Sequence, residues 1–146
     1  MGEGEHSSRV LVSNRQTSPL DEAGLVELAA VCLAGEGVTS SELSVSFVTV
    51  EEMAELHERY ADEEGPTDVL SFPLDEDEGE DGMRLLGDVV IAPDVAVVNN
   101  PADPATELRL LLVHGILHLL GHDHEDDEGR ACMWTKQERY TGVRVP

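Results

Sequence analysis

Three histidines in the C-terminal half of the sequence have the spacing of metal ligands. His114 and His118 are four residues apart, so on a helix their imidazoles lie on one face, one turn apart. Gly121 lets the chain reverse after such a helix, and His124 then follows as a third imidazole. Zinc accepts three imidazoles and keeps a fourth position for water, whose pKa falls to about 7. The spacing therefore predicts a catalytic Zn²⁺ site of one ion, three histidines and a water.

The residue after the first histidine limits which reaction such a site performs. The metzincin peptidase pattern H-E-x-x-H-x-x-G-x-x-H matches here except at its glutamate, where this chain has Gly115. In those peptidases the glutamate takes a proton from the zinc-bound water and passes it to the leaving amine. Glycine does neither, so amide hydrolysis is disfavoured. A phosphodiester fits better, because metal and a cation can stabilise its charge without that glutamate.

The helix that carries these histidines is predicted from its capping residues. Asp103 and Pro104 suit the N-cap and the first helical position, and Gly121 suits the residue after the C-terminus. Apolar residues surround the helix almost completely, which is typical of a buried helix. We therefore expect the metal site on a central buried helix.

The remaining elements are predicted from hydrophobic periodicity. Period-two alternation, β-branched residues and turn residues predict strands at 9–14, 42–50, 67–74 and 85–93. Helical patterns are found at 19–37, 49–61, 103–121 and 126–142, and Thr49 with Glu52 has capping-box spacing. The order predicts an α/β (or α+β) fold, a single mixed four-stranded sheet covered by about five helices. Residues 1–146 form one domain in this interpretation, with 75–83 as an acidic mobile loop.

The net charge of −22, taken alone, argues against a nucleic-acid partner. The sequence has 31 acidic residues against nine lysines and arginines. High solubility explains this charge, and adaptation to a salty cytoplasm is a second hypothesis, because counterions screen self-repulsion. Phosphate contacts need clustered cations. Four bases lie at or just after the last helix, either as a local RNA-facing patch or as an ordinary solvated face: Arg130, Lys136, Arg139 and Arg144.

Cysteine usage and the N-terminus bear on localisation. Cys32 and Cys132 are too far apart in sequence for a metal knuckle and make no disulfide framework. The first residues lack the basic-then-apolar pattern of a secretion signal, and no apolar run is long enough to cross a membrane. We expect a cytoplasmic protein without a membrane partner.

Three motifs together resemble those of the YbeY family, the bacterial rRNA-maturation endoribonucleases. They are "GPTDVLSFP" (65–73), "LLGDVVIAP" (85–93) and "HGILHLLGHDH" (114–124), in this order. The resemblance implies a zinc-dependent, single-strand-specific endoribonuclease in 16S rRNA 3′-end maturation and ribosome quality control. It implies metal ligands at His114, His118 and His124. The implied partners are single-stranded RNA or rRNA precursor, the small ribosomal subunit and assembly factors.

One family position departs from the pattern. Many members carry an arginine directly after the aromatic residue that precedes the P-T-D segment, but here Tyr60 is followed by Ala61. Arg59 lies on the other side of Tyr60 and is the candidate catalytic residue, stabilising charge on the phosphoryl oxygens. The alternative is a solvated helix arginine. Asp68 and Ser71 are predicted either to line the cleft or to satisfy backbone groups.

Two other functions remain open at this point. One is a metallopeptidase that uses a residue other than the missing glutamate as its base. The other is a non-catalytic ribosome assembly factor whose zinc only holds the fold. The second predicts a closed coordination sphere with a fourth protein ligand, for which His122 and Asp123 are the first candidates.

Overall fold

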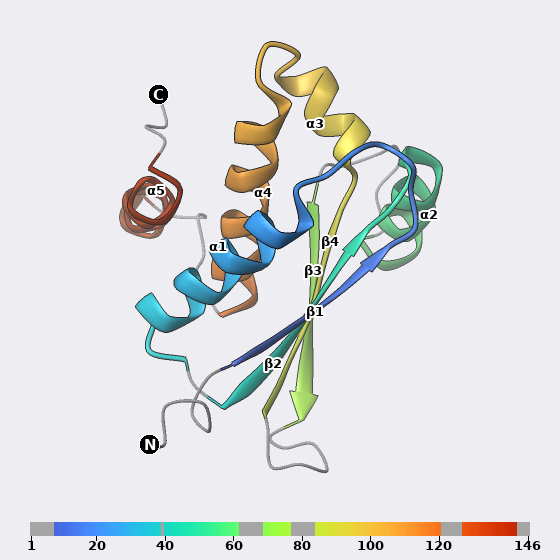
Figure 1. Cartoon of the computed structure of the whole chain (residues 1–146). Helices are drawn as coiled ribbons and strands as arrows, with labels where there is room; N and C mark the ends of the chain where they lie inside the picture. Colours follow the sequence, from blue (N-terminus) through green and yellow to red (C-terminus); the bar gives the residue numbers. More distant parts are fainter. Residues whose placement is uncertain (1–7, 39, 62–68, 77–83, 121–126, 143–146) are drawn as a thin grey trace.

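The computed structural model describes residues 8–38, 40–61, 69–76, 84–120 and 127–142. Nine elements follow one another along this part of the chain (Figure 1). They are β1 (Arg9–Asn14), α1 (Glu22–Gly35), β2 (Ser41–Phe47), α2 (Val50–Ala61), β3 (Val69–Glu76), β4 (Arg84–Ile91), α3 (Pro93–Asn99), α4 (Pro104–Leu119) and α5 (Asp127–Thr141).

The strands form one mixed sheet in the order β1-β2-β4-β3. β1, β2 and β4 are parallel, and β3 is an antiparallel edge strand paired with β4. Parallel neighbours need crossover helices, and α1 is the crossover between β1 and β2. The predicted α/β fold with a four-stranded mixed sheet and about five helices is thereby confirmed.

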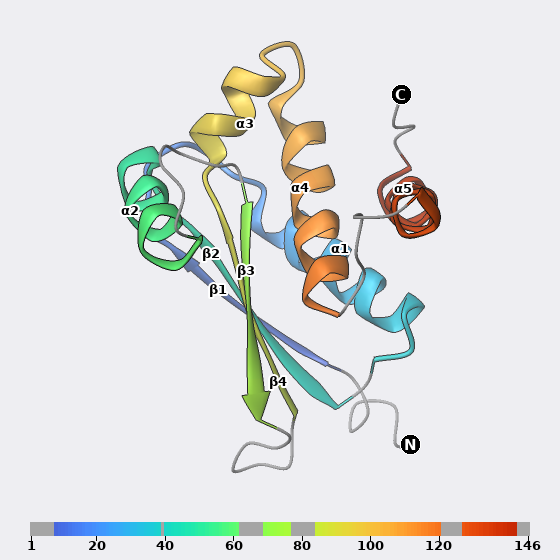
Figure 2. The same cartoon turned by 180° about the vertical axis from the view of Figure 1, so that it is seen from behind.

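The two faces of the sheet are covered unequally. α1, α4 and α5 lie on one side of the sheet and α2 on the other (Figures 1 and 2). The burial of β2 reflects this difference. Its residues alternate between buried and half-buried, and the buried side chains of Leu43, Val45 and Phe47 point into the main core. A second, smaller core forms under α2 around Met53 and Val90. The histidine-bearing helix α4 therefore belongs to the larger core.

Two predicted strand ends are wrong. The strand expected at 42–50 ends at Phe47, because Thr49 caps α2 and accepts the backbone N–H of Glu52 at 3.1 Å. β3 continues through Glu76, so the acidic loop expected from residue 75 begins later. Residues 77–83 lie outside the described part, and the loop's mobility stays a prediction.

Helix α3 was not predicted separately. Proline at its first position ends the preceding strand and starts the helix. The helix has only seven residues, and two of its apolar side chains, Val97 and Val98, are 44% and 77% exposed. A helix this short, with apolar residues on its outer face, gives no readable periodicity.

The C-terminal helix α5 is fastened to the end of α1 by Glu36. Its carboxylate accepts hydrogen bonds from Lys136 Nζ at 2.7 Å and from Tyr140 Oη at 2.5 Å. The Glu36 side chain is only 6% exposed. We call these three residues, together with the adjacent buried Cys32, the α1–α5 junction.

The junction predicts a loss of stability at alkaline pH. Burial raises the pKa of Cys32 from 9.0 to about 12, and burial plus the bond to Glu36 raises that of Tyr140 from 10.0 to about 12. Both pKa values are higher in the folded state, so their stabilising effect is complete below pH 9 and disappears as pH rises toward 12. Each group should lower the free energy of unfolding by up to about 1.4 kcal/mol per pH unit.

Urea denaturation at a series of pH values between 8 and 12 measures this loss. Cys32→Ala and Tyr140→Phe should each flatten the slope. Cys132→Ala, which removes the exposed cysteine, is the matched control and should keep the wild-type slope. An unchanged slope in Cys32→Ala would contradict the assignment.

In the described residues no helix is both long and apolar enough to cross a bilayer.

Candidate metal centre

Helix α4 begins as predicted and is buried along most of its length. Asp103 is the N-cap; its carboxylate accepts the backbone N–H of Thr106 at 3.2 Å, and Pro104 follows. The Thr106 hydroxyl donates to the same carboxylate at 2.5 Å, and both hydrogen bonds lower the pKa of Asp103, the side-chain bond most. The buried residues of the helix are Leu108, Leu111, Leu112, Val113, Gly115, Ile116 and Leu117. The expected central buried helix is therefore present.

His114 and His118 lie together near the C-terminal end of α4. Their ring centroids are 6.3 Å apart and the ring planes differ by 13°. His114 is half-buried and His118 is exposed. The one-turn spacing thus places two imidazoles on one face, with the second open to solvent.

The His114 ring is held by α5. Its Nδ1 lies 2.9 Å from Oε1 of Gln137, a residue only 6% exposed. An amide oxygen can only accept, so this contact is a hydrogen bond when Nδ1 is the protonated nitrogen, and Nε2 is then the nitrogen that can ligate a metal. Metal-ligating histidines almost always have their other ring nitrogen engaged in this way. The donor set around His114 therefore fits a zinc ligand.

The third predicted ligand, His124, lies outside the described residues, as do His122 and Asp123. Among the residues that are described, no three His, Cys, Asp or Glu side chains gather closely enough to hold a metal ion. The structure brings two of the three predicted ligands together, and the complete site stays a prediction.

Gly115 is the point at which α4 presses on the sheet. A Cβ placed there would lie 2.7 Å from Val89 Cγ1 and 3.0 Å from Val69 Cγ2. The Ser71 hydroxyl donates to the Gly115 carbonyl oxygen at 2.9 Å. Ser71 therefore satisfies a backbone group, one of its two predicted roles. The sequence showed only that Gly115 is not the peptidase glutamate; the structure shows that the sheet occupies the space of any side chain.

Arg59 lies away from the His114–His118 pair. It is exposed in the last turn of α2, which covers the opposite face of the sheet from α4. To act at the histidine pair, the Arg59 side chain would have to reach from α2 toward α4 around the edge strand β3. Residues 62–68, which include Asp68, lie outside the described part, and the catalytic role of Arg59 stays a prediction.

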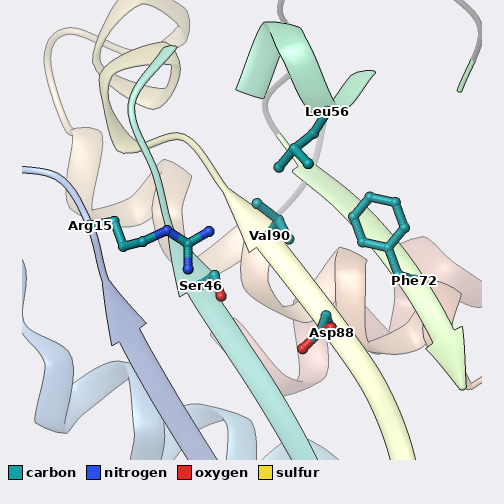
Figure 3. Close-up of a pocket in the computed structure, with 6 residues that line it drawn as sticks. All are labelled: Arg15, Ser46, Leu56, Phe72, Asp88 and Val90. Atoms are coloured by element: carbon teal, nitrogen blue, oxygen red, sulfur yellow. The ribbon is translucent and has the colours of Figure 1, made fainter. Parts of the chain in front are cut away.

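A cavity of about 520 Å³ lies on the α2 side of the sheet (Figure 3). Side chains alternate along β4, and Val89 faces α4, so Asp88 and Val90 face this cavity. It is lined by Arg15, Ser46, Leu56, Phe72, Asp88 and Val90. Its residues come from five separate segments of the chain, so no local sequence pattern marks it.

The cation in that cavity is already paired. Arg15 Nη2 lies 2.6 Å from Glu52 Oε2, and this bond holds the pKa of Arg15 above its ordinary value. Asp88 adds a second acid nearby. The charges of the described lining residues therefore do not favour an anion, and the sheet separates this cavity from His114 and His118.

The predicted basic patch on the last helix loses one member. Lys136 points to Glu36 across the α1–α5 junction, and its side chain is 25% exposed. Arg139 is exposed, the side chain of Arg130 is not described, and Arg144 lies outside the described residues. Lys136 thus acts as a structural ion-pair partner of Glu36.

An α/β fold with two imidazoles paired on its central helix does not by itself define a reaction, and comparison with known proteins defines the family. The family model described as Endoribonuclease YbeY matches residues 12–142. The chain therefore belongs to the YbeY endoribonuclease family, and its enzyme class is that of a ribonucleolytic hydrolase.

Three curated relatives match over 84–98% of their own length. An Endoribonuclease YbeY of Beutenbergia cavernae is 49% identical, with 88% of this chain and 91% of the relative covered. One from Streptomyces coelicolor is 42% identical, covering 86% and 84%, and one from Cutibacterium acnes is 42% identical, covering 91% and 98%. The solution structure of a Thermotoga maritima protein matches with a TM-score of 0.56 at 26% identity, over 92% of this chain and 86% of that one.

Proposed function

We propose that this endoribonuclease is zinc-dependent and cuts single-stranded RNA, with His114, His118 and His124 as the metal ligands. The observation that carries the proposal is the pairing of His114 with His118 on the buried helix α4, the first with its Nδ1 engaged by Gln137. Three imidazoles leave one coordination position open, which is the arrangement of a catalytic rather than a structural zinc.

The residues around the His114–His118 pair have separate roles in this proposal. When bound, zinc supplies Lewis acidity toward a phosphoryl oxygen and toward water. His118 is exposed, so an RNA strand can approach the site from solvent. Gly115 offers no side chain that could accept a proton. Arg59 is the proposed cation that stabilises charge developing on the phosphoryl oxygens.

The biological setting follows from the family. We propose maturation of the 16S rRNA 3′ end and ribosome quality control in the cytoplasm, with rRNA precursor, small ribosomal subunit and assembly factors as partners. Residues 1–146 act as a single domain in this proposal.

His118→Ala tests the function directly. Cleavage of a labelled single-stranded RNA by zinc-loaded protein in high KCl should fall at least about 100-fold, because the variant lacks one of three ligands. Zinc content, measured on the same samples, should fall with it.

His57→Ala is the matched control, since it removes a histidine from α2 on the other face of the sheet. It should cut RNA at the wild-type rate. Full cleavage by His118→Ala would overturn the assignment of the site. Zinc-loaded wild type that binds the RNA but does not cut it would instead favour the assembly-factor alternative.

A further inference from the structure

We infer that Gln137 is a positioning residue for the metal ion: it fixes His114 as the Nδ1–H tautomer, so that Nε2 is the nitrogen available to zinc. This inference rests on the proposed function. It concerns a residue on α5 that belongs to none of the three sequence motifs.

The contact has the properties of a fixed interaction. The distance from Nδ1 to Oε1 is 2.9 Å, the usual length of an N–H···O hydrogen bond. Gln137 is only 6% exposed, so water competes weakly for its oxygen and the bond is stronger than in solvent. A neutral imidazole has two tautomers, and the partner of one nitrogen decides which nitrogen can ligate a metal.

The backbone that carries Gln137 is itself restrained. The Thr141 hydroxyl donates to the Gln137 carbonyl oxygen at 2.5 Å, within α5. Arg109 Nη2 of α4 donates to the Thr141 carbonyl oxygen at 3.2 Å. One turn of α5 is thereby tied to the helix that carries His114.

The α1–α5 junction restrains the same helix from the other direction. Lys136 directly precedes Gln137, and Tyr140 lies three residues later; both bond to the buried carboxylate of Glu36. Contacts with both α4 and α1 therefore hold the part of α5 that carries Gln137. Such support orients a ligand before the metal arrives, and its loss typically lowers metal affinity 10–100-fold.

The first experiment measures the tautomer without metal. ¹⁵N-detected NMR of the metal-free full chain should show His114 with its proton on Nδ1. In Gln137→Leu, which keeps the side chain's size but removes the acceptor, Nε2–H should become populated. A wild-type His114 that carries its proton on Nε2 would overturn the inference.

The second experiment measures zinc affinity by competition with a chromophoric chelator. Gln137→Leu should weaken zinc binding about 10–100-fold. Gln137→Glu should restore it, because a carboxylate also accepts from Nδ1–H. Gln16→Leu makes the same substitution in the segment between β1 and α1, where Gln16 bonds to Asn14 and Ser18, and is the matched control; it should bind zinc as the wild type does.

The outcomes separate this inference from the proposed function. Wild type that fails to bind zinc contradicts the zinc-dependent function, while the tautomer measurement still decides the role of Gln137. Wild type and Gln137→Leu that bind zinc equally well, with both folded by circular dichroism, contradict the inference alone. Failure of Gln137→Glu to recover affinity would mean that packing, rather than the acceptor oxygen, is what matters.

Discussion

Gly115→Glu is expected to unfold the protein rather than to supply the base of a peptidase. The glycine has no space beside it: a Cβ would meet Val89 at 2.7 Å and Val69 at 3.0 Å. Valine is stiff at χ1, and Val89 is fully buried, so neither the strand nor its side chain can yield cheaply. Burying an unpaired carboxylate adds a further penalty. We expect a loss of about 4 kcal/mol or more in the free energy of unfolding.

Urea denaturation of three variants separates the causes. Gly115→Ala adds only the Cβ and should lose about 1–3 kcal/mol, although alanine has the better helix propensity. Ala30→Glu places the same new charge at an exposed position of α1 and should stay within about 0.5 kcal/mol of wild type. A Gly115→Ala variant more stable than wild type would show that the sheet does yield.

Removing the carboxylate of Glu36 is expected to have the second-largest effect. Glu36→Ala leaves Lys136 and the Tyr140 hydroxyl without the oxygens they bind at 2.7 and 2.5 Å. Breaking a buried pair from one side leaves an uncompensated charge, which costs about 3–5 kcal/mol when burial is complete. Lys136 is 25% exposed, so we expect about 2–3 kcal/mol.

An exposed ion pair in the same chain is the matched control. Arg9 and Glu42 lie 3.1 Å apart across β1 and β2, with side chains 48% and 20% exposed. Glu42→Ala should cost less than about 1 kcal/mol and lose even that in high salt. Equal losses for Glu36→Ala and Glu42→Ala would mean that the α1–α5 junction contributes no more than a surface contact.

Most of the fold could be predicted because it depends on local patterns. Alternation along β2 and the caps of α4 are properties of neighbouring residues, and the structure confirms them. Glu36 shows where local rules fail. An acid at the C-cap of α1 opposes the helix dipole. Its partners are 100 and 104 residues away. Local sequence cannot show such a pairing.

The candidate site also combines a local pattern with a long-range contact. The spacing of His114 and His118 encodes their proximity directly, since both lie on one helix. Gln137 lies 23 residues after His114, and a glutamine on a polar helix gives no sequence signal that it contacts a histidine. The rule that a ligating histidine donates its second N–H to an acceptor would have directed a search to the polar residues of α5. His124 and Arg59 stay predictions.

The place of Gln137 on the last helix has a consequence during synthesis of the chain. Translation delivers His114 and His118 first and the amide that holds His114 only 23 residues later. At about 5–20 residues per second, this is an interval of roughly 1–5 s. For that time the nascent chain has both histidines of α4 but not the acceptor that orients the first. The contact that orients His114 toward the proposed metal ion therefore forms only when α5 docks against α4.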